Sequence, residues 1–162
     1  MSAQPTVHLV DASIYVFRAY FSVSPEFVDV DDRPVHAVFG FLNTLLTLLH
    51  DEKPSHVAIC FDESLTTSFR NRLYPAYKAN REPAPVELKP QFQRCRALCR
   101  HLGLADFASE DYEADDVIGT LATRMRTHGL RATLVTRDKD LSQLVRAGDC
   151  FWDFAGDQRY GY

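Results

Sequence analysis

Three short apolar runs in this sequence each end close to an aspartate. The runs and the aspartates that follow them are 7–10 with Asp11, 57–61 with Asp62, and 132–135 with Asp138. Apolar runs of this length, stopped by polar residues, are typical of strands buried on both faces of a parallel sheet. Because ligands bind outside the carboxyl ends of such strands, the sequence predicts an acidic site at one edge of a sheet.

The segments between these runs carry apolar residues at three- and four-residue spacing, the period of an amphipathic helix. The expected helices are 36–50, 86–102, 113–128 and a short one at 139–146. The expected strands are 7–10, 57–61, 104–108, 132–136 and 150–154. This alternation predicts an α/β fold, a three-layer sandwich whose mainly parallel central sheet is flanked by helices on both faces.

Two stretches interrupt the alternation. Residues 22–35 are polar and are expected to form a loop, and residues 63–85 are polar, basic and aromatic. A loop as long as the second is usually functional or disordered, and its arginine, lysine and tyrosine content favours function. Residues 151–162, after the last expected helix, are typical of a hairpin.

The composition sets the class of protein. A length of 162 residues fits one domain, 1–162, and no apolar run approaches the roughly 20 residues that span a bilayer. The first residues have neither the basic start nor the apolar core of a signal peptide, so we expect a cytoplasmic protein with no membrane partner. The four cysteines form no Cys-x-x-Cys pair, which favours buried free thiols over a disulfide or a zinc site.

The net charge of −4 hides a strong segregation of charge along the chain. Residues 110–116 contain five carboxylates and no basic side chain, whereas 69–81 contain four basic side chains and no acidic one. A basic segment can hold a polyanion, and an acidic pocket can hold cations. The two together favour a protein that binds nucleic acid and divalent metal.

Seven carboxylates fall at expected strand ends or at the start of an expected helix: Asp11, Asp62, Glu113, Asp115, Asp116, Asp138 and Asp140. Oxygen donors suit Mg²⁺ or Mn²⁺ and argue against zinc, which prefers histidine and cysteine. Two ions about 4 Å apart clamp the attacking and leaving oxygens of a phosphodiester. We therefore expect one or two Mg²⁺ or Mn²⁺ ions and no organic cofactor. The alternative is that these acids are helix caps and solvated loop residues.

The basic segment repeats its side chains at three- and four-residue spacing, so that on a helix Arg70, Tyr74, Tyr77, Lys78 and Arg81 would share one face. Arginine and lysine bind phosphates, and tyrosine rings stack on the bases of an unpaired strand. The segment therefore predicts a contact with nucleic acid. The alternative is a solvated helix with a few packed aromatic side chains.

Five motifs occur in the order and spacing of one known family: 9–13, 61–62, 69–70 with 77–81, Tyr-Glu-Ala-Asp-Asp at 112–116, and Thr-Arg-Asp-Lys-Asp-Leu at 136–141. On these residues, and along nearly its whole length, the chain resembles the bacterial 5′-3′ exonuclease and flap endonuclease family, which includes the N-terminal nuclease domain of DNA polymerase I. The resemblance implies a PIN-like (resolvase-like) fold. It also implies divalent-metal-dependent hydrolysis of DNA phosphodiesters at a 5′ flap or a free 5′ end, in replication and repair.

The resemblance further implies roles for individual residues. By position, the seven carboxylates look like the family's metal-site residues, and 63–85 looks like its helical arch, through which a free 5′ end passes. Lys78 and Arg81 would steady the scissile phosphate as catalytic residues. The DNA-binding set would comprise these two with Arg70 and Arg72 on the strand and Tyr77 stacked on a base near the cut.

One departure from the family pattern leaves alternatives open. Family members continue with a helix–three-turn–helix module that grips duplex DNA and with a Gly-Asp-x-Ser-Asp-Asn-type segment of further metal-site acids. This sequence ends at Tyr162 with neither, so a non-catalytic or weakly active DNA-binding fragment is the alternative function. A receiver-type phosphoacceptor domain would need an acidic pair after the first strand, where Ala12 and Ser13 stand. A PIN-type ribonuclease shares the fold, but the arch-like segment favours DNA flaps.

Overall fold

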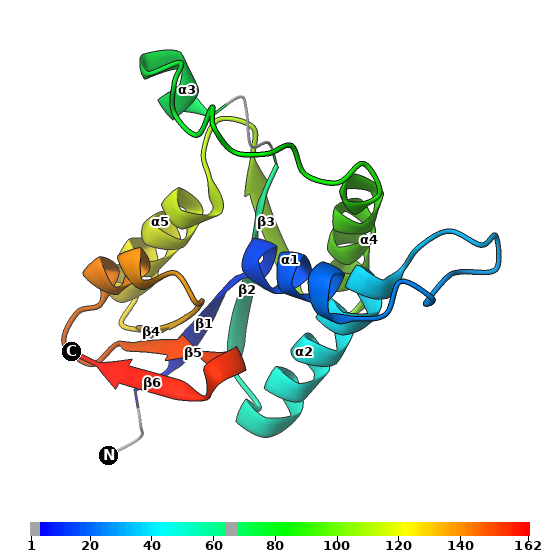
Figure 1. Ribbon diagram of the computed structural model, residues 1–162. Helices are drawn as coiled ribbons and strands as arrows, with labels where there is room; N and C mark the ends of the chain where they lie inside the picture. The colour runs from blue at the N-terminus through cyan, green and yellow to red at the C-terminus, as the bar shows by residue number, and fades with distance from the viewer. Residues whose placement is uncertain (1–3, 64–67) are drawn as a thin grey trace.

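Six strands form a single sheet in the order β3-β2-β1-β4-β5-β6, which places the N-terminal strand in the middle (Figure 1). The computed structural model describes residues 4–63 and 68–162. The strands are β1 (Thr6–Asp11), β2 (His56–Asp62), β3 (Ala105–Ser109), β4 (Arg131–Val135), β5 (Cys150–Asp153) and β6 (Gln158–Gly161). Neighbouring strands are parallel except β5 and β6, which form the expected antiparallel hairpin.

Helices cover both faces of this sheet, so the predicted three-layer α/β sandwich is confirmed. They are α1 (Ala12–Ser22), α2 (His36–Glu52), α3 (Phe69–Leu73), α4 (Leu88–His101), α5 (Ala114–Thr127) and the 3-10 helices η1 (Lys139–Leu144) and η2 (Phe154–Gly156). Helices α1, α2 and α4 pack on one face, and α5 with η1 packs on the other. α3 projects away from the sheet above its carboxyl edge (Figure 1).

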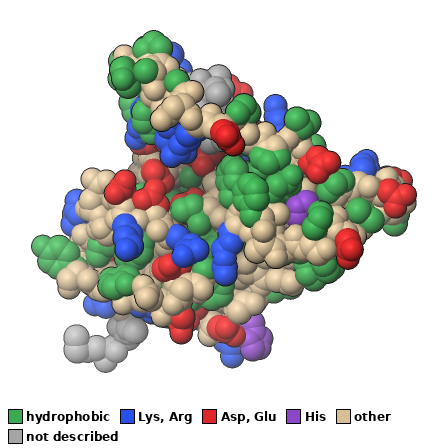
Figure 2. All heavy atoms as spheres, in the orientation of Figure 1, with side chains coloured by type: hydrophobic (Ala, Val, Ile, Leu, Met, Phe, Trp, Pro, Cys, Tyr) green, Lys and Arg blue, Asp and Glu red, His purple; other side chains and the backbone are tan. Residues whose placement is uncertain are grey.

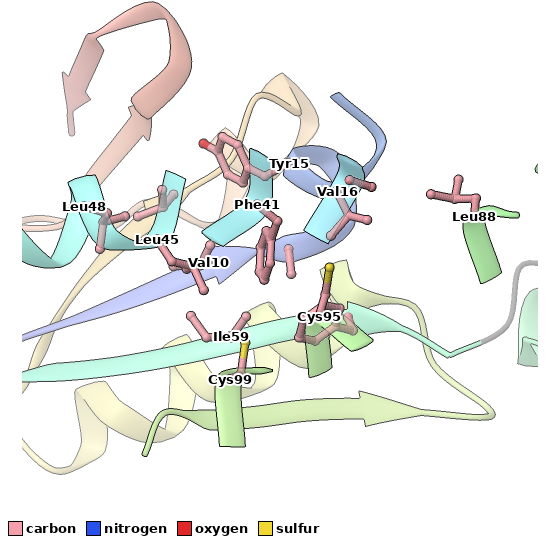
Figure 3. Packing of buried hydrophobic residues seen from close by; sticks show 14 of the residues in the cluster. Val10, Tyr15, Val16, Phe41, Leu45, Leu48, Ile59, Leu88, Cys95 and Cys99 are labelled. Carbon is pink, nitrogen blue, oxygen red and sulfur yellow. The ribbon is translucent and has the colours of Figure 1, made fainter. Parts of the chain in front are cut away.

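The alternation of side chains along each strand divides the apolar core into two halves. On the first face, Val10 of β1 and Ile59 of β2 pack among residues of α2 and α4, including Phe41 and Cys95 (Figure 3). On the second face, side chains one position away in the same strands, such as Leu9, pack against α5. Strands β1, β2, β4 and β5 are therefore held between two apolar layers, whereas β6 is exposed along its length.

Helix α1 was not among the helices expected from the sequence. It begins directly after β1, and it buries Tyr15 and Val16 against the first face and Ala19 beside α2. Its aromatic and polar residues weaken the apolar period that would have revealed it. α1 also lies very close to α2, because a Cβ at Gly40 would come within 2.7 Å of the Ala19 Cβ.

The expectation that one helical face carries the basic side chains of 70–81 is wrong. α3 ends at Leu73, and Tyr74 is extended, with φ −140° and ψ 93°. Proline at position 75 disfavours a helical conformation in the residue before it. Lys78 adopts a left-handed conformation with φ 55°, so the chain continues from Tyr74 through a series of turns. The basic side chains are therefore placed by turns as well as by one short helix.

The remaining expectations about the chain concern its cysteines, its polar loop and membranes. All four cysteines are free thiols, and three of them are buried. The loop 22–35 contains a single isolated antiparallel β-bridge, between Val28 and Pro34. Within residues 4–63 and 68–162, no helix is both long and apolar enough to cross a bilayer.

Candidate active site

The carboxyl ends of β1, β2 and β4 and the beginning of α5 meet at one edge of the sheet. β1 and β2 are in register with Asp11 opposite Cys60, so Asp62 lies two residues further along the same edge. Figure 2 shows acidic side chains gathered in the hollow below the projecting α3 segment, with basic side chains directly above them. The strand-end rule thus placed the acidic site at the correct edge.

Asp11 is the most deeply buried acid of this edge, with 3% of its surface exposed. Its Oδ2 accepts a hydrogen bond from the Thr136 Oγ1 at 2.9 Å. The pKa of Asp11 is raised to about 7, chiefly by burial and then by the nearby charges of Asp62 and Asp115, against the lowering effect of the hydrogen bond from Thr136. A cation placed among these carboxylates would offset the repulsion between their negative charges.

Asp62 ties the end of β2 to the beginning of α5. Its Oδ1 accepts a hydrogen bond from the Ala114 amide at 2.8 Å, and its own amide donates to the Ser13 Oγ at 3.0 Å. The first amides of a helix have no partner within the helix, so an acid in this position also benefits from the helix dipole. Asp62 therefore fixes where α5 delivers its own acids.

Asp115 follows one residue later and faces other acids. Its pKa is raised to about 6, chiefly by burial and then by the charges of Asp138, Asp62 and Glu113, against a smaller lowering effect of Lys78. Within the described part of the chain, its carboxylate makes no hydrogen bond or ion pair. Asp115 is thus a carboxylate held among like charges without a cation of its own.

Asp138 and Asp140 lie at the beginning of η1. Asp138 is the N-cap residue, and its Oδ1 accepts a hydrogen bond from the Asp140 amide at 2.9 Å. The Asp138 amide donates to the Thr136 Oγ1 at 3.0 Å, so one buried hydroxyl joins Asp138 to Asp11. The side chain of Asp140 is exposed at the rim.

Glu113 and Asp116 face the basic segment instead. The Lys78 Nζ donates to the Glu113 Oε2 at 2.7 Å, and the Tyr77 hydroxyl donates to the same oxygen at 3.2 Å. Arg70 forks onto both oxygens of Asp116 at 2.5 and 2.7 Å. That ion pair lowers the pKa of Asp116 and raises the pKa of Arg70.

The other predicted DNA-binding residues lie further from the acids. Arg72 pairs with Asp111 outside the pocket, at 2.6 Å. Arg81 is exposed after the last turn, and its amide donates to the Lys78 carbonyl. The structure therefore brings Arg70, Tyr77 and Lys78 onto the acidic edge and leaves Arg72 and Arg81 at its margin.

The donor set of this edge fits a hard divalent cation. It offers carboxylate oxygens, and two of its acids, Asp11 and Asp115, have pKa values raised by burial and by neighbouring carboxylates. Within residues 4–63 and 68–162, no three His, Cys, Asp or Glu side chains lie close enough together to hold one ion. The side chains are instead arranged by their hydrogen bonds and ion pairs to protein groups.

Sequence reasoning missed the hydroxyl groups that hold these acids. Thr136 and Ser13 are both buried, and each connects the ends of two neighbouring strands or their following residues. A hydroxyl residue directly after an apolar strand is a usable signal, because a buried carboxylate needs a donor. Asp153, at the end of β5, was also missed; it accepts a hydrogen bond from the Arg137 Nε at 3.3 Å.

Comparison with known proteins assigns the family. The model of the 5′-3′ exonuclease N-terminal resolvase-like domain matches residues 6–160. The chain belongs to the 5′-3′ exonuclease family. This family is one of nucleases, so the resemblance inferred from the five motifs is confirmed, as is the resolvase-like fold.

Relatives of this exonuclease-family domain are bacterial DNA polymerases I. The chain is 41% identical to DNA polymerase I of Rhizobium leguminosarum over 160 residues, which cover 94% of this chain and 16% of the polymerase. It is 40% identical to that of Chloroflexus aurantiacus, covering 88% and 15%. The chain thus spans about one sixth of the length of these relatives.

Solved structures share the fold at lower identity. The bacteriophage T5 5′-exonuclease with divalent zinc ions bound superposes with a TM-score of 0.70 at 17% identity, covering 96% of this chain and 58% of that one. The catalytic core of Rad2 in complex with DNA substrate gives a TM-score of 0.52 at 16% identity, covering 85% and 41%. Both likenesses concern the fold alone.

Proposed function

We propose that this domain is a divalent-metal-dependent 5′-3′ exonuclease and flap endonuclease that hydrolyses DNA phosphodiesters. One observation carries the proposal: the basic side chains Arg70 and Lys78 lie directly on the acidic edge of the sheet. A polyanion bound by these basic side chains would have a phosphate over the acidic edge, where cations are favoured. Family membership and the likeness to structures solved with metal ions and with DNA support it.

The metal-holding role in this proposal falls to six acids: Asp11, Asp62, Glu113, Asp115, Asp138 and Asp140. We exclude Asp116 from it because both of its oxygens are already bound by Arg70. Glu113 keeps one oxygen outside the contacts with Lys78 and Tyr77, which use only Oε2. Bound Mg²⁺ or Mn²⁺ would lower the pKa of a coordinated water and neutralise charge on the scissile phosphate.

The chain's own residues supply positioning. Lys78 is half-buried at the mouth of the pocket, and its ammonium group can pass from Glu113 to a phosphate oxygen that arrives beside it. Arg81, which is exposed three residues further along the chain, is proposed as a second phosphate contact. Tyr77, whose ring lies 5.0 Å from the Lys78 Nζ, is proposed to stack on a base of the unpaired strand.

The alternative is a DNA-binding domain that does not cut by itself. It is favoured by the pairing of Lys78 with Glu113, because an acid that holds a lysine is less available to a metal ion. Both functions place DNA on the same face. They differ only in whether the carboxylates capture metal once DNA is bound.

Cleavage of a 5′-labelled flap DNA separates the two functions. We expect cutting in Mg²⁺ or Mn²⁺, none in EDTA, and a loss of at least 100-fold in the Asp115→Asn variant, because that change removes an unpartnered acid of the pocket. Asp157→Asn is the matched control, since Asp157 is an exposed acid in the β5–β6 turn. Binding without any cutting would reject the nuclease and leave the alternative. Equal cutting by both variants would reject the assignment of the site.

A further inference from the structure

Two neighbouring acids of α5 have opposite surroundings. Asp115 has no hydrogen bond or ion pair within the described residues; the charges that act on it most are the carboxylates of Asp138, Asp62 and Glu113, and Lys78 opposes them more weakly. The Asp116 carboxylate accepts three hydrogen bonds, two from the Arg70 guanidinium and one from the Glu113 amide. The two acids cannot be distinguished in the sequence, because both follow Glu113 within the first turn of one helix. Asp116 is therefore already paired with a cation, Arg70, whereas Asp115 has no such partner among the described residues.

Asp116 is held from two directions. Its Oδ2 accepts a hydrogen bond from the Glu113 amide at 3.1 Å, which closes the first turn of α5 and fixes the carboxylate. Both oxygens then receive the parallel Nη1 and Nη2 donors of Arg70. A bidentate pair of this kind sets the plane and the direction of the guanidinium as well as its position.

Arg70 keeps the capacity to bind a second anion. A guanidinium has five N–H donors, and the fork onto Asp116 uses two of them. Its guanidinium carbon lies 4.8 Å from the centre of the Phe69 ring, so the group contacts an aromatic ring as well as the Asp116 carboxylate. The Arg70 side chain is 30% exposed and faces the pocket, with Nη1 4.0 Å from the Glu113 Oε2.

We propose that Asp116 is a positioning residue that aims Arg70 at a backbone phosphate of the bound DNA strand and that does not coordinate metal. This inference rests on the proposed function, which makes DNA the substrate. Asp116 acts on DNA only through Arg70. The metal is left to Glu113 and to the acids on its other side, Asp11, Asp62, Asp115, Asp138 and Asp140; among the described residues these five form no ion pair with a basic side chain.

Simple electrostatics predicts the opposite change in DNA affinity for the Asp116→Asn variant. Removing a carboxylate near a basic segment makes the surface less negative, which by charge alone would tighten DNA binding. If Asp116 positions Arg70, the Asp116→Asn variant binds DNA more weakly, because the guanidinium loses its fixed direction. Asp115→Asn removes the same charge one residue away and binds DNA more tightly in the absence of metal. The two variants form a matched pair with opposite expected outcomes.

The first test measures binding of a fluorescein-labelled 5′-flap DNA by anisotropy in EDTA. We expect Asp116→Asn and Arg70→Ala each to raise the dissociation constant by about tenfold, at about 1.4 kcal/mol per tenfold. The double variant should lose no more than Arg70→Ala alone, because both changes break one interaction. Additive losses, or tighter binding by Asp116→Asn, would overturn the proposal. Circular dichroism confirms that each variant is folded.

The second test measures Mn²⁺ binding by electron paramagnetic resonance without DNA. We expect Asp115→Asn to weaken Mn²⁺ binding by at least tenfold and Asp116→Asn to change it by less than twofold. Equal weakening in the two variants would overturn the proposal, since Asp116 would then be a ligand. If the wild-type chain binds no Mn²⁺, the metal part of the proposed function fails, and the anisotropy cycle in EDTA still supports or refutes the role of Asp116.

Discussion

Replacing Asp11 by asparagine should stabilise the metal-free protein. The aspartate is buried among other acids, and its pKa is raised from 3.8 to about 7, chiefly by burial and then by Asp62 and Asp115. Asparagine has nearly the same shape, carries no charge, and its carbonyl oxygen can still accept the hydrogen bond from Thr136. The substitution therefore removes an electrostatic cost that the fold bears at neutral pH.

The magnitude follows from the change in proton affinity. A rise in pKa from 3.8 to about 7 corresponds to about 4 kcal/mol, at about 1.4 kcal/mol for each tenfold change. This is an upper limit for the gain in the free energy of unfolding, because side chains and water rearrange around a buried charge. We expect about half of it, about 2 kcal/mol, at pH 8.

The gain must also depend on pH in one direction. Between pH 3.8 and about 7 the unfolded chain has released the Asp11 proton while the folded chain retains it, so wild-type stability falls as the pH rises. Below pH 3.8 both states are protonated and the asparagine variant has no advantage. The gain should therefore be absent at pH 3.5, grow through pH 5 and 6, and be complete above pH 7.

Urea denaturation in EDTA, followed by circular dichroism at a series of pH values, measures this gain. Asp140→Asn is the control, because Asp140 belongs to the same edge but is exposed, and its free energy of unfolding should change by less than about 0.5 kcal/mol. Adding Mg²⁺ should stabilise the wild type more than the Asp11→Asn variant. A variant that is less stable than the wild type at pH 8, or equally favoured at pH 3.5, would refute the reasoning.

Four further substitutions test how the scaffold is held, and the free energy of unfolding of each is measured by urea denaturation. Gly40→Ala should lower the free energy of unfolding by about 1–2 kcal/mol, because the new Cβ would lie 2.7 Å from the Ala19 Cβ. Gly119→Ala, whose nearest neighbours lie at 3.6 Å, should raise it by about 0.5 kcal/mol. Equal effects of the two substitutions would contradict the close approach of α1 and α2. Asp149→Asn should cost about 3 kcal/mol, because this buried acid pairs with Arg126 and accepts from the Ala132 amide, and an unchanged midpoint would show that the pair contributes nothing. Asp106→Asn should lower the free energy of unfolding by about 1 kcal/mol at pH 7, because Asp106 forms ion pairs with Arg100 and Arg96. These ion pairs, that with Arg100 first, lower the pKa of Asp106, so their contribution is present above pH 3.8 and is lost as the pH falls below that value. A destabilisation that persists at pH 2 would reject this explanation.

The position of the acidic edge could be predicted because it depends on local signals. Asp11 and Asp62 each stop an apolar run, and parallel strands bring their carboxyl ends to the same edge. Asp115 and Asp116 begin a helix whose apolar period is clear in the sequence. For these residues, position along the chain is sufficient to determine position in the fold.

The contacts that distinguish one acid from another could not be predicted. Arg70 reaches Asp116 across 46 positions of the chain, and Thr136 reaches Asp11 across 125, so no local pattern connects either pair. The single helical face expected for 70–81 failed for a different reason. The three- and four-residue spacing of the basic side chains is that of a helix, but the proline at position 75 disfavours a helical conformation at Tyr74, and α3 ends at Leu73.

The central place of β1 has a consequence for how the protein acquires its site during synthesis. β1 pairs on one side with β2, about 50 residues later, and on the other with β4, where Thr6 lies opposite Arg131. A growing chain can form the first pair early, but the second edge of β1 stays open until residues 131–135 have left the ribosome. The step that closes this edge also brings Thr136 to Asp11. The acidic pocket and the last half of the core are therefore completed together, and a nascent chain cannot carry the site before it is folded.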